Sequence, residues 1–213
     1  KRLWIGSFQS MHRLFPVCLV AGLSILFQTG QAANARPLVV QASSYPTYYF
    51  AQRVATDSFD VRYRVPNAVD PAFWRPGDED LIAFQQADII LLNGATYEKW
   101  LKTVTLPRSI LLDTSKGFSD QYLESEGELH QHGNGIAHSH GGTAMTTWLD
   151  FALAAKQAES IAERFIVEAP GDAAAIEERL AALIEDLEEL DDRMNAVGEA
   201  VSYTHLTLPT SPK

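Results

Sequence analysis

The chain has 213 residues, of which 46% are hydrophobic and 10% aromatic, which is enough apolar material for a folded domain. Its formal net charge at pH 7 is -10, with 17 Lys and Arg against 27 Asp and Glu. A nucleic-acid-binding surface needs clustered Lys and Arg, and none is found, so the composition excludes nucleic acid as an expected partner.

A hydrophobic run lies near the start of the chain. It follows a basic pair at residues 12–13, extends over residues 14–27 as LFPVCLVAGLSILF, and precedes small residues that include Ala33 and Ala35. A core this short is typical of a cleaved secretory signal peptide; the alternative is a retained membrane anchor. We predict that residues 1–35 comprise upstream residues and a signal peptide. The mature protein is then expected to be periplasmic or exported, monomeric, and without stable membrane insertion.

Short apolar runs alternate with helix-like stretches from residue 37 onward. The runs PLVVQAS, FDVRYRVP, ADIILLNG and RSILLDTS are predicted strands, and PTYYFAQRVAT, DEDLIAFQQ and TYEKWLKTV are the predicted helices between them. Apolar runs of this length with intervening helices indicate βαβ units and a parallel sheet. The sequence therefore predicts an α/β lobe over residues 37–150.

Two further helices are predicted after this lobe. The stretch TTWLDFALAAKQAESIAERF has helical periodicity, and a long helix is expected to begin after Gly171 with Asp172 as its N-cap. Its apolar positions alternate four and three apart in one stripe: Ile176, Leu180, Leu183, Leu187, Leu190 and Met194. The stripe suits either a short coiled coil or a helix that packs on a neighbouring lobe. We assign residues 150–199 to this helical segment and expect residues 200–213, which break its acidic register, to be a non-native tail.

Histidines are concentrated in residues 119–143, a stretch without helix or strand periodicity. Four of the six histidines lie in HQHGNGIAHSH: His130, His132, His138 and His140. Alternate residues of an extended segment point to one side, so both histidines of each His-x-His pair can bind the same ion. Gly133 and Gly135 allow the chain to turn and bring the two pairs together. Imidazole is the commonest biological metal ligand, so the pattern predicts metal binding. A solvated loop with weak affinity is the alternative.

Motifs of enzymes are not found in the sequence. It has no nucleophile elbow, no phosphate-binding glycine loop and no His-Glu-x-x-His helix. A metal-dependent hydrolase therefore has no motif to support it, and we predict binding and release without turnover.

Several longer stretches occur in a particular order. They are VVQASSYPTYYFAQRVA, VPNAVDPAFWRPGDEDLIAFQQADIILLNGATYEKWL, the histidine-rich loop, TTWLDFALAAKQAESIAERF and the long acidic helix. In this order they resemble the zinc- and manganese-binding solute receptors of ABC importers, over residues 37–195. The resemblance implies two α/β lobes joined by one long helix, of which this chain holds the first lobe and the helix, with the second lobe largely absent. It also implies that the apolar stripe faces the second lobe, that the partner is a membrane permease, and that the cargo is a divalent ion, zinc first, with manganese as an alternative. Copper and nickel are further alternatives, because they suit imidazole ligands as well as zinc does.

Two positions depart from the pattern of that family. The family usually has Asp-Pro-His where this chain has Asp70-Pro71-Ala72, and a histidine where this chain has Thr146. Alanine has no donor atom and a threonine hydroxyl is a poor zinc ligand, so neither first-lobe ligand carries over. Either binding has moved to the histidine loop, or the protein is a receptor for something else. The first possibility makes His130, His132, His138 and His140 the candidate site.

A different class of function also stays open. Between Asp172 and Arg193 the long helix has nine acidic residues against two arginines. A scaffold or interaction protein without a metal could use this acidic, striped helix to dock a partner, with the histidines incidental.

Overall fold

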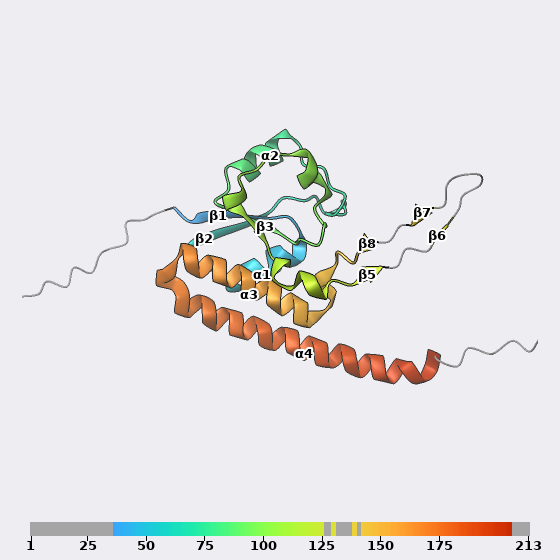
Figure 1. Ribbon diagram of the computed structural model, residues 1–213. Helices are drawn as coiled ribbons and strands as arrows, with labels where there is room; N and C mark the ends of the chain where they lie inside the picture. The colour runs from blue at the N-terminus through green and yellow to red at the C-terminus, as the bar shows by residue number, and fades with distance from the viewer. Residues whose placement is uncertain (1–35, 126–128, 131–137, 140–141, 206–213) are drawn as a thin grey trace, which may run out of the picture. The chain divides into compact units, whose positions relative to one another are not determined.

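The computed structural model describes residues 36–125, 129–130, 138–139 and 142–205, so the predicted signal peptide lies outside the described residues. Its centre is a four-stranded sheet, ordered β2-β1-β3-β4, with every neighbouring pair parallel (Figure 1). The strands are β1 (Leu38–Ala42), β2 (Phe59–Tyr63), β3 (Ile89–Leu92) and β4 (Leu111–Asp113). The predicted α/β lobe with a parallel sheet is confirmed.

Helices cover both faces of the sheet, as a parallel sheet requires (Figure 1). On one face, Val40 and Ile89 share a buried cluster with residues of α1 (Tyr45–Val54) and α3 (Phe151–Glu168). On the other face, Ile90 packs in a second cluster with Phe84 of α2 (Asp78–Gln85) and Trp100 of the 3-10 helix η1 (Lys99–Thr103). The alternation of strand side chains thus divides the apolar residues between two cores.

Local signals fix where the main helices begin. Ser44 caps α1 by accepting a hydrogen bond from the Thr47 N–H at 3.4 Å, and Asp150 caps α3 by accepting one from the Leu153 N–H at 3.1 Å. Short 3-10 turns precede β4 (η2, Arg108–Ile110) and α3 (η4, Thr147–Leu149).

The helix predicted over residues 96–104 is shorter than expected. Only η1 forms there, because the chain first passes through a turn in which Gly94, Ala95 and Thr96 all have positive φ. A residue in that region cannot continue a right-handed helix, so the first predicted turn is lost.

The long helix α4 (Ala173–His205) packs on its own lobe over its first half. Ile176, Leu183 and Leu187 are buried in the core cluster that contains α1 and α3, and Arg53 of α1 pairs with Asp186 at 2.7 Å. The expectation that the whole stripe faces a second lobe is therefore wrong for this half. The stripe becomes exposed only beyond Leu187, and the helix continues through residue 205, past the break predicted at residue 200.

The connection into α4 is a 3-10 turn, η5 (Pro170–Asp172). The Asp172 carboxylate, predicted to cap the helix, accepts hydrogen bonds from the hydroxyls of Thr56 at 2.5 Å and Ser58 at 2.6 Å. These bonds lower the pKa of the Asp172 carboxyl. The side chain thus fastens the start of α4 to the segment that leads into β2.

Residues 119–143, predicted without periodicity, contain regular structure in their described parts. The 3-10 helix η3 (Lys116–Gln121) is followed by two short antiparallel ladders. β5 (Glu124–Ser125) pairs with β8 (Gly142–Thr143), and β6 (Leu129–His130) pairs with β7 (His138–Ser139). Strands of two residues are too short to give a periodic signal, which explains why sequence patterns missed them.

Candidate functional site

Ligands of open parallel sheets bind beyond the carboxyl ends of the strands, at the point where the strand order reverses. In this sheet the reversal lies between β1 and β3, since β1 connects outward to β2 on one side and β3 leads to β4 on the other. Ser43 and Ser44 follow β1, and Asn93 and Gly94 follow β3; the side chains of Ser43, Ser44 and Asn93 are fully buried. Polar groups buried at this edge need partners, and they find them in one network.

The carboxylate of Glu98 joins the ends of β1 and β3. Its Oε1 accepts hydrogen bonds from the Ser43 hydroxyl and the Asn93 N–H, both at 2.6 Å, and its Oε2 accepts one from the Gly94 N–H at 3.3 Å. Burial raises the pKa of the Glu98 carboxyl, and these hydrogen bonds oppose the rise by stabilising the ionised form. Three donors from two strand ends therefore meet on one buried acid.

The turn after β3 places backbone where no side chain fits. A Cβ on Gly94, whose φ is 83°, would lie 2.0 Å from Asp113 Oδ1 and 2.3 Å from Ser115 Oγ. Ala95 and Thr96 follow with φ of 49° and 62°, a conformation that costs an L-residue roughly 1–2 kcal/mol. The Glu98 carboxylate stabilises this strained turn through its contact with the Gly94 N–H.

Asn93 links the sheet to the segment that follows β8. Its Nδ2 donates to the Met145 carbonyl at 2.8 Å, and its Oδ1 accepts from Gln157 of α3 at 3.2 Å and from the Thr147 hydroxyl at 3.4 Å. Gln157 also donates to the Thr114 hydroxyl at 2.8 Å. The network thus holds the ends of β3 and β4, the start of α3 and the exit of the histidine-rich stretch together. These residues belong to no motif, so sequence patterns do not predict them as part of a site.

The two positions that depart from the family pattern lie near this edge. Ala72 is 2% exposed, and its N–H donates to Asp70 Oδ1 at 2.9 Å. Thr146 is exposed beside a hollow of about 370 Å³ that Tyr122 and Asp150 also line. Neither residue carries a nitrogen ligand. No group of three or more His, Cys, Asp or Glu side chains that could hold an ion occurs within the described ranges.

Aromatic rings occupy much of the same edge. The rings of Tyr48 and Tyr63 are stacked with centroids 5.7 Å apart, and the ring of Tyr97 meets Trp148 edge-on at 5.3 Å. Burial, and then the neighbouring charge of Asp70, raise the pKa of the Tyr97 hydroxyl well above its ordinary value. The carboxyl edge of this lobe is therefore aromatic and acidic where the family pattern has imidazoles.

Of the four candidate histidines, the structure describes the backbone of two. His130 lies directly opposite His138 in the antiparallel β6–β7 pair. His132 and His140 lie outside the described residues, so the predicted four-histidine site is not tested as a whole.

Comparison with known proteins agrees with this fold. A family model described as ZnuA, the periplasmic component A of a zinc-uptake complex, matches residues 40–211. This chain belongs to that family. The family consists of solute-binding proteins and not enzymes, which confirms the expectation of a non-catalytic protein, and it is periplasmic by its description. Over the described residues, we find no helix with the length and apolar character needed to cross a membrane.

Individual relatives are distant. The zinc-binding lipoprotein AdcA of Streptococcus pneumoniae is 27% identical over 180 residues, which are 81% of this chain and 36% of that protein. The metal ABC transporter substrate-binding lipoprotein SsaB of Streptococcus sanguinis is 27% identical over 187 residues, 84% of this chain and 56% of that protein. The chain thus spans 36% and 56% of the length of these two curated relatives.

Solved structures share the lobe and the helix. A zinc-bound ZnuA deletion mutant has a TM-score of 0.63 at 25% identity, over 76% of this chain and 58% of that one. FpvC from Pseudomonas aeruginosa, solved in complex with Mn²⁺, has a TM-score of 0.62 at 18% identity, over 76% and 57% of the two chains, and shows a common fold.

Proposed function

We propose that this protein binds a divalent metal ion through His130, His132, His138 and His140 and presents it to the membrane permease of an ABC importer. Zinc is the ion proposed first, because the relatives include a zinc-binding lipoprotein and a metal transporter receptor, and because imidazole suits zinc. Manganese, copper and nickel are the alternatives, since imidazole affinity alone does not select among these ions.

The observation that carries the proposal is the pairing of His130 with His138. Directly opposed residues of an antiparallel pair share one face, with Cβ atoms about 4.5–5.5 Å apart. Two imidazoles at that separation can bind one ion at the usual Zn–N distance of about 2.0–2.1 Å. His132 and His140 each follow one member of this pair by two residues, the spacing at which an extended chain returns to the same face. Because the two strands are antiparallel, this register, if continued, would put His132 on one side of the pair and His140 on the other.

The composition of the sheet edge supports moving the site to this segment. Ala72 and Thr146 offer no nitrogen where the family has histidines, and the buried acid that joins the ends of β1 and β3, Glu98, is already engaged by three donors. In the sequence, the histidines between residues 36 and 199 are the four of the candidate site and no others.

Zinc titration of the full chain tests the proposal. We expect saturable binding that is lost when all four histidines are changed to alanine and kept when His205, which lies outside the candidate site, is changed to alanine. Unchanged binding by the fourfold variant would contradict the assignment of these residues. No binding by the parent protein would contradict metal binding itself and favour the scaffold alternative.

The proposal also includes export of the protein and a membrane permease as its partner. We propose that residues 1–35 are removed as a signal peptide and that the mature monomer works by binding and releasing the ion outside the cytoplasm. Release to a permease needs no turnover, so the affinity for the ion and the rate of its release are the quantities that define the activity.

A further inference from the structure

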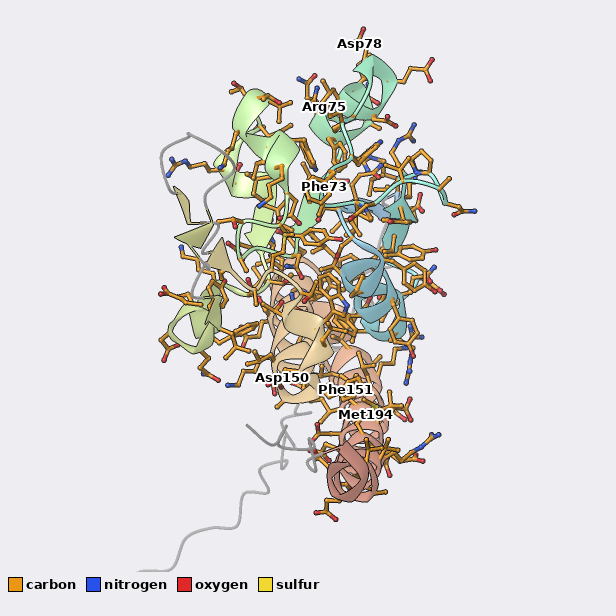
Figure 2. All side chains as sticks on the ribbon, turned by 90° about the vertical axis from the view of Figure 1, so that its right-hand side faces the viewer. Phe73, Arg75, Asp78, Asp150, Phe151 and Met194 are labelled. Atoms are coloured by element: carbon orange, nitrogen blue, oxygen red, sulfur yellow. The ribbon has the colours of Figure 1, made fainter. Side chains whose placement is uncertain are left out.

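A hollow, here named the α2–η1 pocket, lies between the segment that leads into α2 and the helix η1. It encloses about 540 Å³. Its two tryptophans, Trp74 and Trp100, belong to the buried cluster on one face of the sheet, whereas α4 packs in the cluster on the other face. In Figure 2, Phe73 and Arg75 lie toward α2 and Met194 of α4 lies at the other end of the view. The sheet therefore separates the pocket from α4.

The walls of the α2–η1 pocket are largely aromatic. The rings of Trp74 and Trp100 are almost fully buried and meet edge-on with centroids 6.4 Å apart. Phe73 is 66% exposed. The remaining apolar residues of the lining are Pro76, Leu81 and Val104. Pockets for small ligands commonly have about 300–1,000 Å³ and apolar or aromatic walls with a few polar groups, so these walls suit a ligand with aromatic rings.

The charged groups that line the pocket are both positive. They are Arg75 and Lys99, and neither forms an ion pair in the part of the chain that the structure describes. Among the described residues, no carboxylate lines the pocket, and the acids that begin α2, Asp78 and Glu79, are not part of its walls. Two like charges at one hollow repel each other, and an anion between them relieves this repulsion.

Trp100 contributes an unused donor to the same wall. Its Nε1–H is buried and has no hydrogen-bond partner among the described residues. Buried donors in folded proteins are almost always paired. The wall is therefore short of one acceptor, and a ligand that carries oxygen atoms brings acceptors with it.

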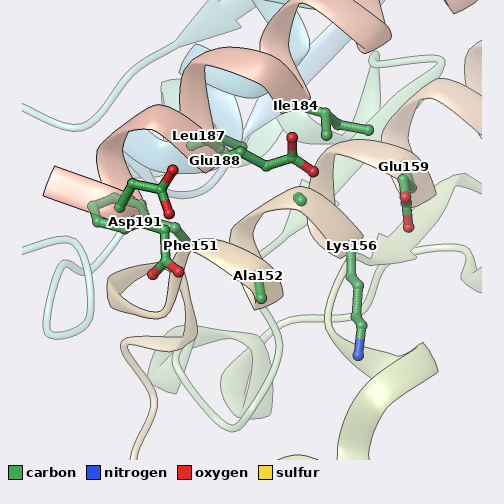
Figure 3. A pocket seen from close by; sticks show the side chains of 10 residues that line it. Phe151, Ala152, Lys156, Glu159, Ile184, Leu187, Glu188 and Asp191 are labelled. Atoms are coloured by element: carbon green, nitrogen blue, oxygen red, sulfur yellow. The ribbon is translucent and has the colours of Figure 1, made fainter. Parts of the chain in front are cut away.

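The groove between α3 and α4 has the opposite charge (Figure 3). It encloses about 470 Å³. Four acids line it: Glu159, Glu188, Asp191 and Asp192. Its cation, Lys156, has its Nζ 2.9 Å from Gln121 Oε1 and is directed away from α4. That groove repels an anion, whereas the α2–η1 pocket attracts one, so two hollows of similar size differ in the charge of the ligand that they favour.

We propose that the α2–η1 pocket binds a small organic anion, an aromatic carboxylate whose rings lie against the aromatic walls and whose carboxylate pairs with Arg75 and Lys99. Arginine suits this role because two parallel N–H groups of its guanidinium match the two oxygens of a carboxylate. The pocket contains no histidine. This ligand site is therefore separate from the proposed metal site and adds a second binding activity to it.

Three compounds with one ring system and different charges test this chemistry by calorimetry, on the full chain without added metal. They are the anion 1-naphthylacetate, the neutral 1-naphthylacetamide and the cation 2-(1-naphthyl)ethylamine. We expect the acid to bind at least about tenfold more tightly than the amide, and the amine to bind more weakly than the amide. The affinity for the acid should fall as NaCl rises from about 0.05 to 0.5 M, because salt screens exposed charges, while that for the amide changes little.

Matched substitutions locate the binding site. Arg75→Gln and Arg108→Gln each remove one positive charge at an exposed position, but only Arg75 lines the pocket. We expect Arg75→Gln to weaken binding of the acid at least about tenfold and to leave the amide unchanged, and Arg108→Gln to alter neither. Lys99→Gln should act in the same direction as Arg75→Gln. Phe73→Ala should weaken the acid and the amide alike, because it removes apolar surface and no charge.

Four results would overturn the proposal. They are equal binding of the acid and the amide, equal effects of Arg75→Gln and Arg108→Gln on the acid, no binding of the acid at concentrations up to about 10 mM, and tightest binding of the amine. The last result would assign the ligand to the acidic groove between α3 and α4. Circular dichroism of each variant establishes that its helices are intact, so that a loss of binding is not a loss of folding.

Discussion

The hydroxyl of Ser43 donates a 2.6 Å hydrogen bond to the carboxylate of Glu98, across a sequence separation of 55 residues. This contact joins the end of β1 to the turn after β3, at the point where the strand order reverses. Among the described residues, Ser43 is the one side chain that donates to the buried Glu98 carboxylate. The other donors to this carboxylate are the backbone N–H groups of Asn93 and Gly94.

Ser43→Ala should therefore destabilise the lobe. Removing a donor to a buried charged group costs about 1.5–3 kcal/mol in unfolding free energy. The loss also takes away one of the bonds that favour the ionised acid, so the pKa of Glu98 should rise further. Urea denaturation measures the change. Ser109→Ala, at an exposed serine, is the control and should alter stability by less than about 0.5 kcal/mol.

Sequence patterns predicted the lobe because its strands are continuous apolar runs separated by helices. They could not predict the polar network at its edge. Glu98 lies in a stretch that has the pattern of an ordinary helix, and Gln157 is one of several polar residues in α3. Their importance comes from hydrogen-bond partners that are distant in sequence: Ser43 donates to Glu98, and Asn93 accepts from Gln157. Periodicity carries no information about such contacts.

Gly94→Ala should be among the most damaging small substitutions in the lobe. The new Cβ would stand 2.0 Å from Asp113 Oδ1, and the backbone at φ of 83° is strained for alanine. We expect a loss of about 3 kcal/mol or more, because the turn must shift and the bond to Glu98 weakens. Gly117→Ala is the matched control, since a Cβ there meets nothing within 4 Å. Equal losses in the two variants would show that the close approach at Gly94 is not what limits stability.

The contact of Asp172 with Thr56 and Ser58 predicts a dependence of stability on pH. Hydrogen bonds from Ser58 and then Thr56 lower the pKa of Asp172, so its ionised form stabilises the folded state above the ordinary aspartate value of about 3.9. That contribution is lost as pH falls through the lower pKa of the folded protein. Asp172→Asn should cost about 1 kcal/mol at pH near 7, and the gap to the parent should close below pH of about 4. Asp57→Asn, at an exposed neighbour, should show neither effect.

The apolar stripe predicted for α4 is present. The prediction that it faces a second lobe is wrong for its first half, which packs on α1 and α3. Leu183 and Leu190 lie seven residues apart on it, yet Leu183 is 1% exposed against α1 and α3 while Leu190 is 39% exposed. A heptad pattern identifies an apolar face, but it does not say which part of the face meets which surface, because that depends on where the neighbouring helices end.

These two leucines therefore offer a matched pair. Leu183→Ala should lower the unfolding free energy by about 2–5 kcal/mol, because it leaves a cavity in the core. Leu190→Ala changes the same residue type at the same heptad position and should cost less than about 1 kcal/mol, because the side chain is already partly in water. Thermal or urea denaturation of both variants measures the difference. Similar costs would mean that the second half of the stripe is also buried in solution.

The histidines were found from composition and spacing alone, and the pairing of His130 with His138 adds a register that spacing could not supply. If these imidazoles bind the ion, protons must compete with it, because only the neutral ring is a ligand. An imidazole is ordinarily half protonated near pH of about 6.5, so zinc affinity should be constant well above that value and fall at least about tenfold between pH of about 7.5 and 5.5. Calorimetric titrations in buffers of different ionisation enthalpy should also report proton release on binding at the lower pH.

The fourfold alanine variant provides the control for this prediction. Zinc binding that it retains through carboxylates should vary little with pH, because free carboxyl groups stay ionised over this range, whereas retained binding that falls with pH would point to His12 or His205. A steep fall in the parent protein beside a flat profile in the variant assigns the pH dependence to the histidines. Zinc affinity of the parent that is the same at both pH values would mean that the ion is held by oxygen ligands, and that the pairing of His130 with His138 in the ladder does not make a metal site.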